Sequence, residues 1–312
     1  MHKQLKIGFL QDLDPFTEEG GGQMNDKGML IKGFQRNHSI DIITPNNISL
    51  KPVEKYDLLI LSNVMSFPRP YLKQVTQKKP YVFFHHDYNF CNHRLFFPMQ
   101  QKCIGCINRE FWLDIYMNAK SHIFLSPLHH KAYLFAYPEL KKFKEITIPS
   151  CMEVDNWKPD TNYERLPGTV VGVNCLEEFK GRKLIERYVA EHPELSFTFV
   201  GTSDNPLPFP NCQYIGFVIN EELPKLYSQH EYFIHLPTSV EPFGRVNAEA
   251  KLCGCKIITN ENNGAFSYEF MKDTNLDNTR KLLSLASLSF WEEIENVMGV
   301  FDYNKISKSI LD

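Results

Sequence analysis

Two glutamates flank the predicted start of a helix, and their spacing suits a ligand with two hydroxyl-bearing groups. Residues 239–250 read Ser-Val-Glu-Pro-Phe-Gly-Arg-Val-Asn-Ala-Glu-Ala. Free backbone amides near Phe243 and Gly244 would form an anion site, and the helix dipole would strengthen it. Glu241 precedes the helix and Glu249 lies over one turn into it. The spacing suits two polyol groups joined by a diphosphate, although a helix-capping Glu241 and a lysine-paired Glu249 explain it equally well.

A run of glycines follows the first predicted strand and opens a helical stretch. It consists of Gly20, Gly21 and Gly22. Backbone without side chains can surround a phosphate or a sugar with its amides, but a flexible loop explains the run equally well. The spacing is not Gly-x-Gly-x-x-Gly, so a dinucleotide-binding dehydrogenase gains little support.

Three cysteines of the first half have the spacing of a candidate zinc site. Cys91, Cys103 and Cys106 form a Cys-x11-Cys-x2-Cys pattern, and His93 is the favoured fourth ligand, with two nearby histidines as competitors. Three thiolates and an imidazole can build a tetrahedral zinc site, and a reducing cytosol favours metal binding over a disulfide. The alternative is three unlinked thiols on a loop.

Charge is distributed unevenly along the 312 residues, whose net charge is −3. Residues 1–150 carry 19 Lys and Arg against 13 Asp and Glu, whereas the remainder carries 15 against 24. A basic first half suits an anionic partner such as a phosphate, a lipid headgroup or a nucleic acid, although ordinary variation in surface charge explains it at least as well.

Composition and hydropathy exclude several classes of protein. The 43% of hydrophobic residues excludes a wholly disordered chain. No apolar run approaches the roughly 20 residues of a membrane-spanning helix. The first residues lack the apolar region and cleavage site of a signal peptide. A cytoplasmic location is therefore expected.

Short apolar runs alternate with amphipathic stretches in both halves, as in parallel sheets covered by helices. In the first half, strands are predicted at 5–13, 40–44, 57–62, 81–86, 122–126 and 145–148, and helices at 23–36, 70–77, 107–118 and 127–135. In the second half, strands are predicted at 169–174, 197–201, 213–217, 232–236 and 256–259, and helices at 181–191, 221–227, 244–253 and 286–310.

The predicted fold class is therefore α/β, with two doubly wound units and a cleft between them. We expect a first domain at 1–150, a linker rich in breakers at 151–168, a second domain at 169–285 and a helical tail at 286–312. Ligands of such sheets bind beyond the carboxyl ends of the strands, so the cleft is the expected binding site.

The glutamate segment also resembles a known motif. Glu-Pro-Phe-Gly-Arg-x-x-x-Glu-Ala is similar to the donor-binding signature of retaining GT-B glycosyltransferases, especially the family-four (glycosyl transferases group 1) type, and the resemblance extends through 254–260 and 264–267. It implies two Rossmann-like domains and a C-terminal helix that returns to the first domain. It also implies that Glu241 contacts the transferred sugar, Phe243 and Gly244 the diphosphate, and Glu249 the ribose.

The same family has further segments with counterparts here. Residues 179–184, Phe-Lys-Gly-Arg-Lys-Leu, are similar to a Lys-Gly-x-x-Leu segment whose lysine faces the donor phosphates, which assigns that role to Lys180. Alone, this residue reads as a solvated lysine at a helix start. The arginine usual a few residues earlier is absent, so Arg182 or Arg245 is expected to supply the second cation. Gly201 resembles a strand-ending glycine beside the nucleotide.

Two further likenesses fall in the first half. Part of the family has a His-Asp pair at the end of the fourth strand, where the histidine approaches the donor sugar. His86 and Asp87 stand at this place and are assigned to sugar or acceptor contacts, with a strand-end histidine bonded to the backbone as the alternative. Gly21 and Gly22 fall where the family has a glycine-rich loop.

The combined prediction is a hexosyl- or pentosyltransferase that moves a sugar from a nucleotide-diphosphate sugar to a hydroxyl acceptor with retention. No catalytic cofactor or metal is expected, and zinc would be structural. The leaving phosphate can take the acceptor proton, so no protein base is required.

The identity of the acceptor and two other classes of function stay open. An anionic acceptor is compatible with the charge, and a nucleic acid with a hydroxylated base is one case, although no base-reading element is visible. A GT-B-like nucleotide-sugar epimerase or hydrolase and a non-catalytic nucleotide-sugar-binding module are the alternatives.

Overall fold

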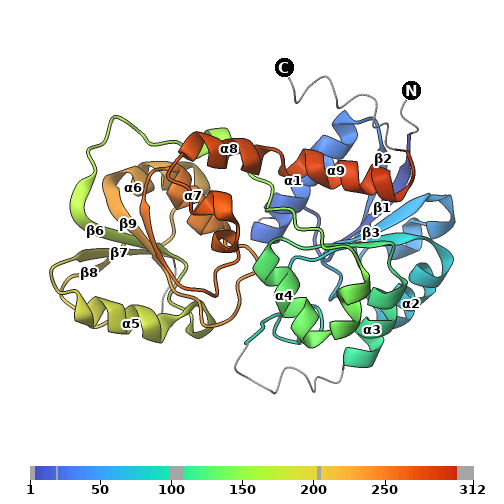
Figure 1. Ribbon diagram of the computed structural model, residues 1–312, viewed down its shortest axis with the longest axis horizontal. Coiled ribbons are helices and arrows are strands. Elements are labelled where there is room, and N and C mark those ends of the chain that lie inside the picture. Colours follow the sequence, from blue (N-terminus) through green and yellow to red (C-terminus); the bar gives the residue numbers. More distant parts are fainter. Residues whose placement is uncertain (1–3, 19, 98–107, 202–204, 301–312) are drawn as a thin grey trace.

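A computed structural model describes residues 4–18, 20–97, 108–201 and 205–300, and it contains two parallel five-stranded sheets (Figure 1). The first sheet has the order β2-β1-β3-β4-β5. Its strands are β1 (Lys6–Leu10), β2 (Ser39–Ile43), β3 (Leu58–Leu61), β4 (Tyr81–Phe84) and β5 (Ser121–Ile123). Every residue of β3 and β4 is buried, as expected for apolar strands that helices cover on both faces. The covering helices are α1 (Gly21–Gln35), α2 (Arg69–Lys78), α3 (Arg109–Asn118) and α4 (Pro127–Ala136).

The second sheet has the order β10-β9-β6-β7-β8. Its strands are β6 (Leu166–Val173), β7 (Ser196–Val200), β8 (Cys212–Tyr214), β9 (His230–His235) and β10 (Lys256–Thr259). The helices between them are α5 (Arg182–Glu191), α6 (Leu223–Gln229) and α7 (Arg245–Leu252). The prediction of two doubly wound units is confirmed.

Each sheet has one point at which the strand order reverses, between β1 and β3 in the first and between β6 and β9 in the second. At such a point the loops that follow two neighbouring strands run to opposite faces of the sheet. A crevice lies between these loops, beyond the carboxyl ends of the strands. The fold therefore offers one crevice in each domain.

Two helices, α8 (Leu276–Ser284) and α9 (Ala286–Val297), carry the chain from the second domain back to the first, where α9 packs against α1 (Figure 1). The fully buried Trp291 donates its indole N–H to the carbonyl oxygen of Met29 at 2.6 Å. A Cβ on Gly33 would overlap the Trp291 ring, so glycine is needed there for the helices to approach. The predicted return of a C-terminal helix to the first domain is confirmed.

Some predicted boundaries differ from the structure. Residues 145–148 form only a single bridge, between Thr147 and Phe124, and the neighbouring chain leaves the sheet soon afterwards because α4 begins at Pro127. The strand β6 begins at Leu166, inside the predicted linker, and α8 was not predicted. The predicted helix 286–310 ends at Val297, and its residues from 301 onward lie outside the described residues.

Within the described part of the chain, every helix is too short or too polar to cross a lipid bilayer.

Candidate active site

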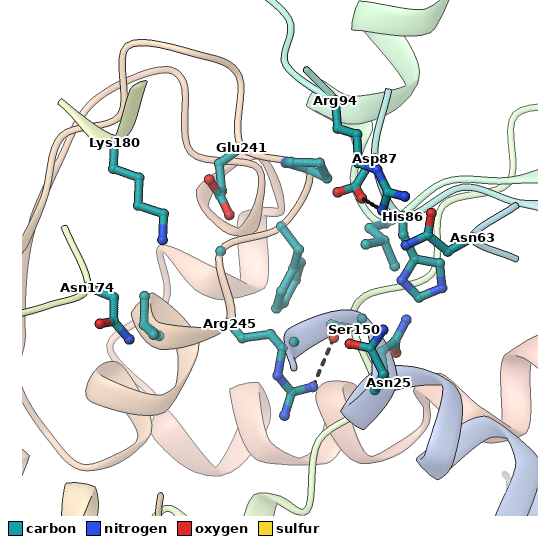
Figure 2. A pocket seen from close by; sticks show the side chains of 18 of the residues that line it. Asn25, Asn63, His86, Asp87, Arg94, Ser150, Asn174, Lys180, Glu241 and Arg245 are labelled. Atoms are coloured by element: carbon teal, nitrogen blue, oxygen red, sulfur yellow. Dashed lines mark hydrogen bonds and ion pairs between the residues drawn. The ribbon is translucent and has the colours of Figure 1, made fainter. Parts of the chain in front are cut away.

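A cavity of about 450 Å³ lies between the two domains, beyond the carboxyl ends of both sheets (Figure 2). From the first domain, the predicted residues Gly21, Gly22, His86 and Asp87 line it. From the second domain, it is lined by the predicted residues Lys180, Glu241, Phe243, Gly244 and Arg245. The structure thus brings nine of the predicted site residues to one cavity.

Backbone contacts hold the loop that carries Glu241. Its N–H donates to the carbonyl oxygen of Asn262 at 2.8 Å, and its own carbonyl oxygen accepts from the N–H of Gly264 at 3.0 Å. A Cβ on Gly264 would overlap the carbonyl oxygen of Pro242, so this packing requires glycine. Gly244 has φ +79° and starts α7, whose first free amides therefore point toward the cavity that Gly244 lines. That this loop and helix terminus bind an anion stays a prediction.

A tight turn positions Lys180 beside this loop. The turn ends at Gly181, with φ +94°, and the N–H groups of Thr238 and Ser239 donate to the carbonyl oxygen of Phe179 at 3.1 and 3.2 Å. Lys180 and Glu241 consequently reach toward the same space (Figure 2). Burial raises the pKa of Glu241. The positive charge of Lys180 lowers this pKa, whereas the negative charge of the Asp87 carboxylate across the cavity raises it further.

A carboxylate beneath the cavity holds His86. The imidazole is buried, and its Nε2 lies 2.9 Å from Oδ1 of Asp26 on α1. The hydroxyl of Ser62 donates to the same carboxylate at 2.9 Å. Burial alone would lower the pKa of His86, but the Asp26 charge and contact outweigh it and raise the pKa above its usual value.

Arg94 joins two carboxylates on the first-domain side of the cavity. Its Nη2 donates to Oδ2 of Asp12 at 2.5 Å, and its Nη1 lies 3.4 Å from Oδ2 of Asp87. Burial raises the pKa of Asp87, although the charges of His86 and Arg94 oppose it. Arg94 lines the cavity and was not predicted as a site residue.

Glu249 and Arg245 face one another one turn apart on α7. Glu249 is buried and does not line the main cavity, and burial raises its pKa although the Arg245 charge opposes this. The Nε of Arg245 lies 3.6 Å from Oε1 of Glu249, and its Nη1 donates to the Ser150 hydroxyl at 3.0 Å and the Cys151 carbonyl oxygen at 2.5 Å. Arg245 also lines a second cavity, of about 600 Å³, beside α1 and residues 220–224. It therefore connects the two cavities.

Arg182 and Gly201 lie apart from the main cavity. They line a neighbouring cavity of about 370 Å³, and Asn174 borders both spaces. Asn174 has φ +47°, and a Cβ on Gly201 would overlap its side-chain amide. Of the two predicted second cations, Arg245 lines the main cavity and Arg182 does not.

The buried His235 at the end of β9 was not predicted, although it lines the cavity. The side-chain amide of Asn247 donates to its Nδ1 at 2.9 Å and to the carbonyl oxygen of Gly244 at 3.2 Å. Burial, with the Lys180 charge, lowers the pKa of His235 to about 4. The ring is therefore neutral at pH 7 and carries its proton on Nε2.

Six other polar residues of the cavity were also missed: Gln23, Asn25, Asn63, Arg94, Ser150 and Asn174. Asn63 and Asn174 stand just beyond β3 and β6. The sequence signal that could have identified Asn63 and Asn174 is a polar residue just after an apolar strand.

The structure describes only two of the four predicted zinc ligands. Cys103 and Cys106 lie outside the described residues. Cys91 is partly buried against an aromatic cluster and His93 is exposed. No cluster of three His, Cys, Asp or Glu side chains suited to a metal occurs in the part of the chain that is described. A structural zinc stays a prediction.

The second domain carries a match to a known family. A family model described as glycosyl transferases group 1 matches residues 176–304, which include Lys180, Glu241 and Glu249. The match covers less than half of the chain and lies within its second domain and C-terminal helices. The chain is a glycosyltransferase that depends on a nucleotide sugar.

Solved structures agree on the fold of this glycosyltransferase across both domains. The HepE protein of Anabaena, in complex with UDP and glucose, is 16% identical over 99% of this chain and 100% of its own, with a TM-score of 0.57. Sucrose-phosphate synthase from Thermosynechococcus elongatus is 16% identical over 97% and 96%, with a TM-score of 0.67. An α-glucosyltransferase in complex with UDP and DNA containing an HMU base is 12% identical over 95% and 100%, with a TM-score of 0.60. The predicted GT-B fold is confirmed. Among curated proteins, none matches the chain.

Proposed function

We propose that this glycosyltransferase moves a hexosyl group from a UDP-sugar to a hydroxyl acceptor, with retention and without a catalytic metal. The observation that carries the proposal is the meeting of Lys180, Glu241 and the amides at Gly244 on one wall of the interdomain cavity, opposite His86 and Asp87. Complexes of similar folds with UDP and with UDP-glucose support a uridine donor.

The second domain binds the donor in this proposal. The diphosphate lies on the first amides of α7 and near Lys180, whose charge stabilises the departing phosphate. Glu249 accepts hydrogen bonds from the ribose, and Arg245, which lies 3.6 Å from it, provides the second cation that the missing family arginine would have supplied. The second cavity, which Arg245 also lines, then takes the nucleoside.

The sugar lies between the two walls. Glu241 accepts hydrogen bonds from its hydroxyls, and the first-domain wall, with His86 held by Asp26, faces the sugar from the opposite side, where the acceptor enters. The bond from the anomeric carbon to the diphosphate oxygen breaks, and the acceptor oxygen forms a bond to the same face of that carbon. The leaving phosphate oxygen takes the proton of the acceptor.

Donor binding tests the proposal first. Thermal unfolding is followed with UDP-glucose, UDP-galactose, UDP-N-acetylglucosamine, GDP-mannose and ADP-glucose, because a ligand at 100 times its Kd stabilises the folded state by about 2.7 kcal/mol. A UDP-sugar should raise Tm most, and Glu249→Gln should weaken its binding by about 1–3 kcal/mol.

Turnover then separates the alternatives. We expect UDP release and a glycosylated product in the presence of an acceptor. Conversion of the UDP-sugar without transfer would instead support an epimerase or hydrolase, and binding without turnover a binding module. Stabilisation by no nucleotide sugar would overturn the proposal.

A further inference from the structure

Three polar residues of the first domain form one wall of the cavity, here named the polar wall. Asn25 on α1, Asn63 after β3 and His86 after β4 are 1%, 9% and 5% exposed, and all three line the cavity (Figure 2). They come from separate segments, so the fold alone brings them together. Side chains this buried normally have their hydrogen bonds satisfied within the protein.

Two of these side chains keep polar atoms without a partner. The backbone N–H of Cys151 donates to Oδ1 of Asn25 at 2.6 Å, which fixes the orientation of the amide and leaves Nδ2 as the free atom. Within the described residues, neither this Nδ2 nor Oδ1 of Asn63 has a hydrogen-bond partner, although both atoms are buried. An unsatisfied buried polar atom costs about 1–3 kcal/mol, so a ligand that pairs with both would recover this energy.

The third residue offers a ring nitrogen. The Nε2 of His86 faces Asp26, so Nδ1 is the nitrogen left for a ligand. A Cβ on Gly22 would lie 3.6 Å from this Nδ1, so glycine leaves the space beside it open. The polar wall thus presents a donor at Asn25, an acceptor at Asn63 and, at His86, a ring nitrogen that donates when the imidazole is protonated and accepts when it is neutral. A hydroxyl group both donates and accepts, and several hydroxyls on one ring match this alternation.

The charges beside the polar wall argue against an anionic ligand. Its neighbouring cation, Arg94, contacts the carboxylates of Asp12 and Asp87, and the His86 imidazole contacts Asp26. Lys180, for which no ion pair occurs among the described residues, belongs to the opposite wall, beside the proposed diphosphate site. A phosphate at the polar wall would meet paired cations and the negative charge of Asp87.

We infer that the polar wall binds the hydroxyls of an uncharged sugar, and that this sugar is the acceptor. The inference rests on the proposed function, which places the donor on the second domain. It assigns Asn25 and Asn63 to acceptor binding and makes an uncharged glycoside the substrate class, in preference to a phosphate-bearing lipid or a nucleic acid.

The test uses a variant that changes a single free atom. Asn25→Asp keeps the oxygen that accepts from Cys151 and replaces only the free Nδ2 by an oxygen. Asn118→Asp is the matched control, because Asn118 is exposed on α3, away from the cavity. UDP release from the best-binding UDP-sugar is measured alone and with p-nitrophenyl glycosides of glucose, galactose and N-acetylglucosamine, with undecaprenyl phosphate, and with duplex DNA containing hydroxymethylcytosine.

We expect at least one uncharged glycoside to accelerate UDP release and to be recovered as a glycosylated product. Asn25→Asp should raise KM for that glycoside at least tenfold, with Kd for the donor within twofold of the unaltered chain and of Asn118→Asp. Asn63→Leu, which removes the free acceptor, should act in the same direction.

Three results would overturn the inference while leaving the proposed function intact. The first is acceleration by undecaprenyl phosphate or DNA alone. The second is an unchanged KM for the glycoside in both variants. The third is a rise in Kd for the donor without a change in KM for the glycoside, which would assign the polar wall to the donor sugar. Absence of donor binding would instead contradict the proposed function itself.

Discussion

Gly181 lies directly against the carbonyl oxygen of Leu236, so that a Cβ on residue 181 would overlap this oxygen. The contact joins the turn that carries Lys180 to the end of β9, and Gly181 also has φ +94°. Both features exclude a side chain at this position. The glycine therefore fixes how far Lys180 stands from the loop of Glu241.

We predict that Gly181→Ala lowers both stability and turnover. The matched control is Gly299→Ala, because Gly299 also has a positive φ, +63°, but a Cβ there would meet nothing within 4 Å. The strained backbone should cost about 1–2 kcal/mol in either variant, whereas only Gly181→Ala adds the overlap with Leu236. Denaturant unfolding and kcat are the measurements. Equal stability loss in the two variants, with normal kcat, would show that the turn relaxes without moving Lys180.

How much of this site could be predicted follows from where its residues lie in the sequence. Lys180, Glu241 and Gly244 belong to short continuous segments, so their types and spacing already indicate an anion site. Asn25 and Asn63 are single amides in separate segments. The role that we propose for them depends on the backbone of Cys151 and on unpaired atoms, neither of which leaves a pattern in the sequence.

The order of strands and helices could be predicted more accurately than the residues at which each of them begins and ends. The apolar runs of β3 and β4 indicate buried parallel strands by themselves, and the alternation with helices indicates two doubly wound units. The end of a strand depends instead on its neighbour. Residues 145–148 have the composition of a strand, but only Thr147 pairs, with Phe124.

A second prediction concerns the charge of Lys180. If it stabilises the leaving diphosphate, Lys180→Ala should lower kcat by about 10²–10³-fold, the usual scale for the loss of one such group. Lys183→Ala is the control, because its side chain is 80% exposed and lies 3.8 Å from Glu178, away from the cavity. Steady-state kinetics with a saturating UDP-sugar give kcat for both. A change of only a fewfold in Lys180→Ala would leave this lysine as a solvated residue.

The contact of α9 with the first domain predicts a dependence of stability on pH. Burial would raise the pKa of Glu295, but the hydrogen bonds and charge of Arg36, together with His38, outweigh it and hold the pKa below its usual 4.5. The unfolded chain therefore takes up this proton at a higher pH than the folded chain. The stabilisation is complete above about pH 4.5 and is lost as pH falls through the folded pKa.

We predict that Glu295→Gln lowers the free energy of unfolding at pH 7 by about 3 kcal/mol, because Glu295 is buried and the guanidinium loses its partner. Glu269→Gln, which breaks an exposed pair with Lys272, should cost less than about 1 kcal/mol. Urea unfolding at pH 7 and pH 4 measures both. Equal losses in the two variants, or a Glu295→Gln loss that does not shrink toward acid pH, would contradict the ion-pair account.

The last prediction separates the charge of His86 from its position. Asp26 raises the pKa of the buried imidazole, so the imidazolium persists to higher pH than in an unfolded chain. Transfer that needs this imidazolium should decline as pH rises through that pKa. In Asp26→Asn the amide still occupies the site but the charge is gone, and burial then lowers the pKa of His86. The alkaline limb of kcat/KM should therefore move to lower pH. Asp114→Asn, an exposed change on α3, should leave the limb in place. If both variants kept the limb of the unaltered chain, Asp26 would position His86 without controlling its proton, and the limb would belong to another group.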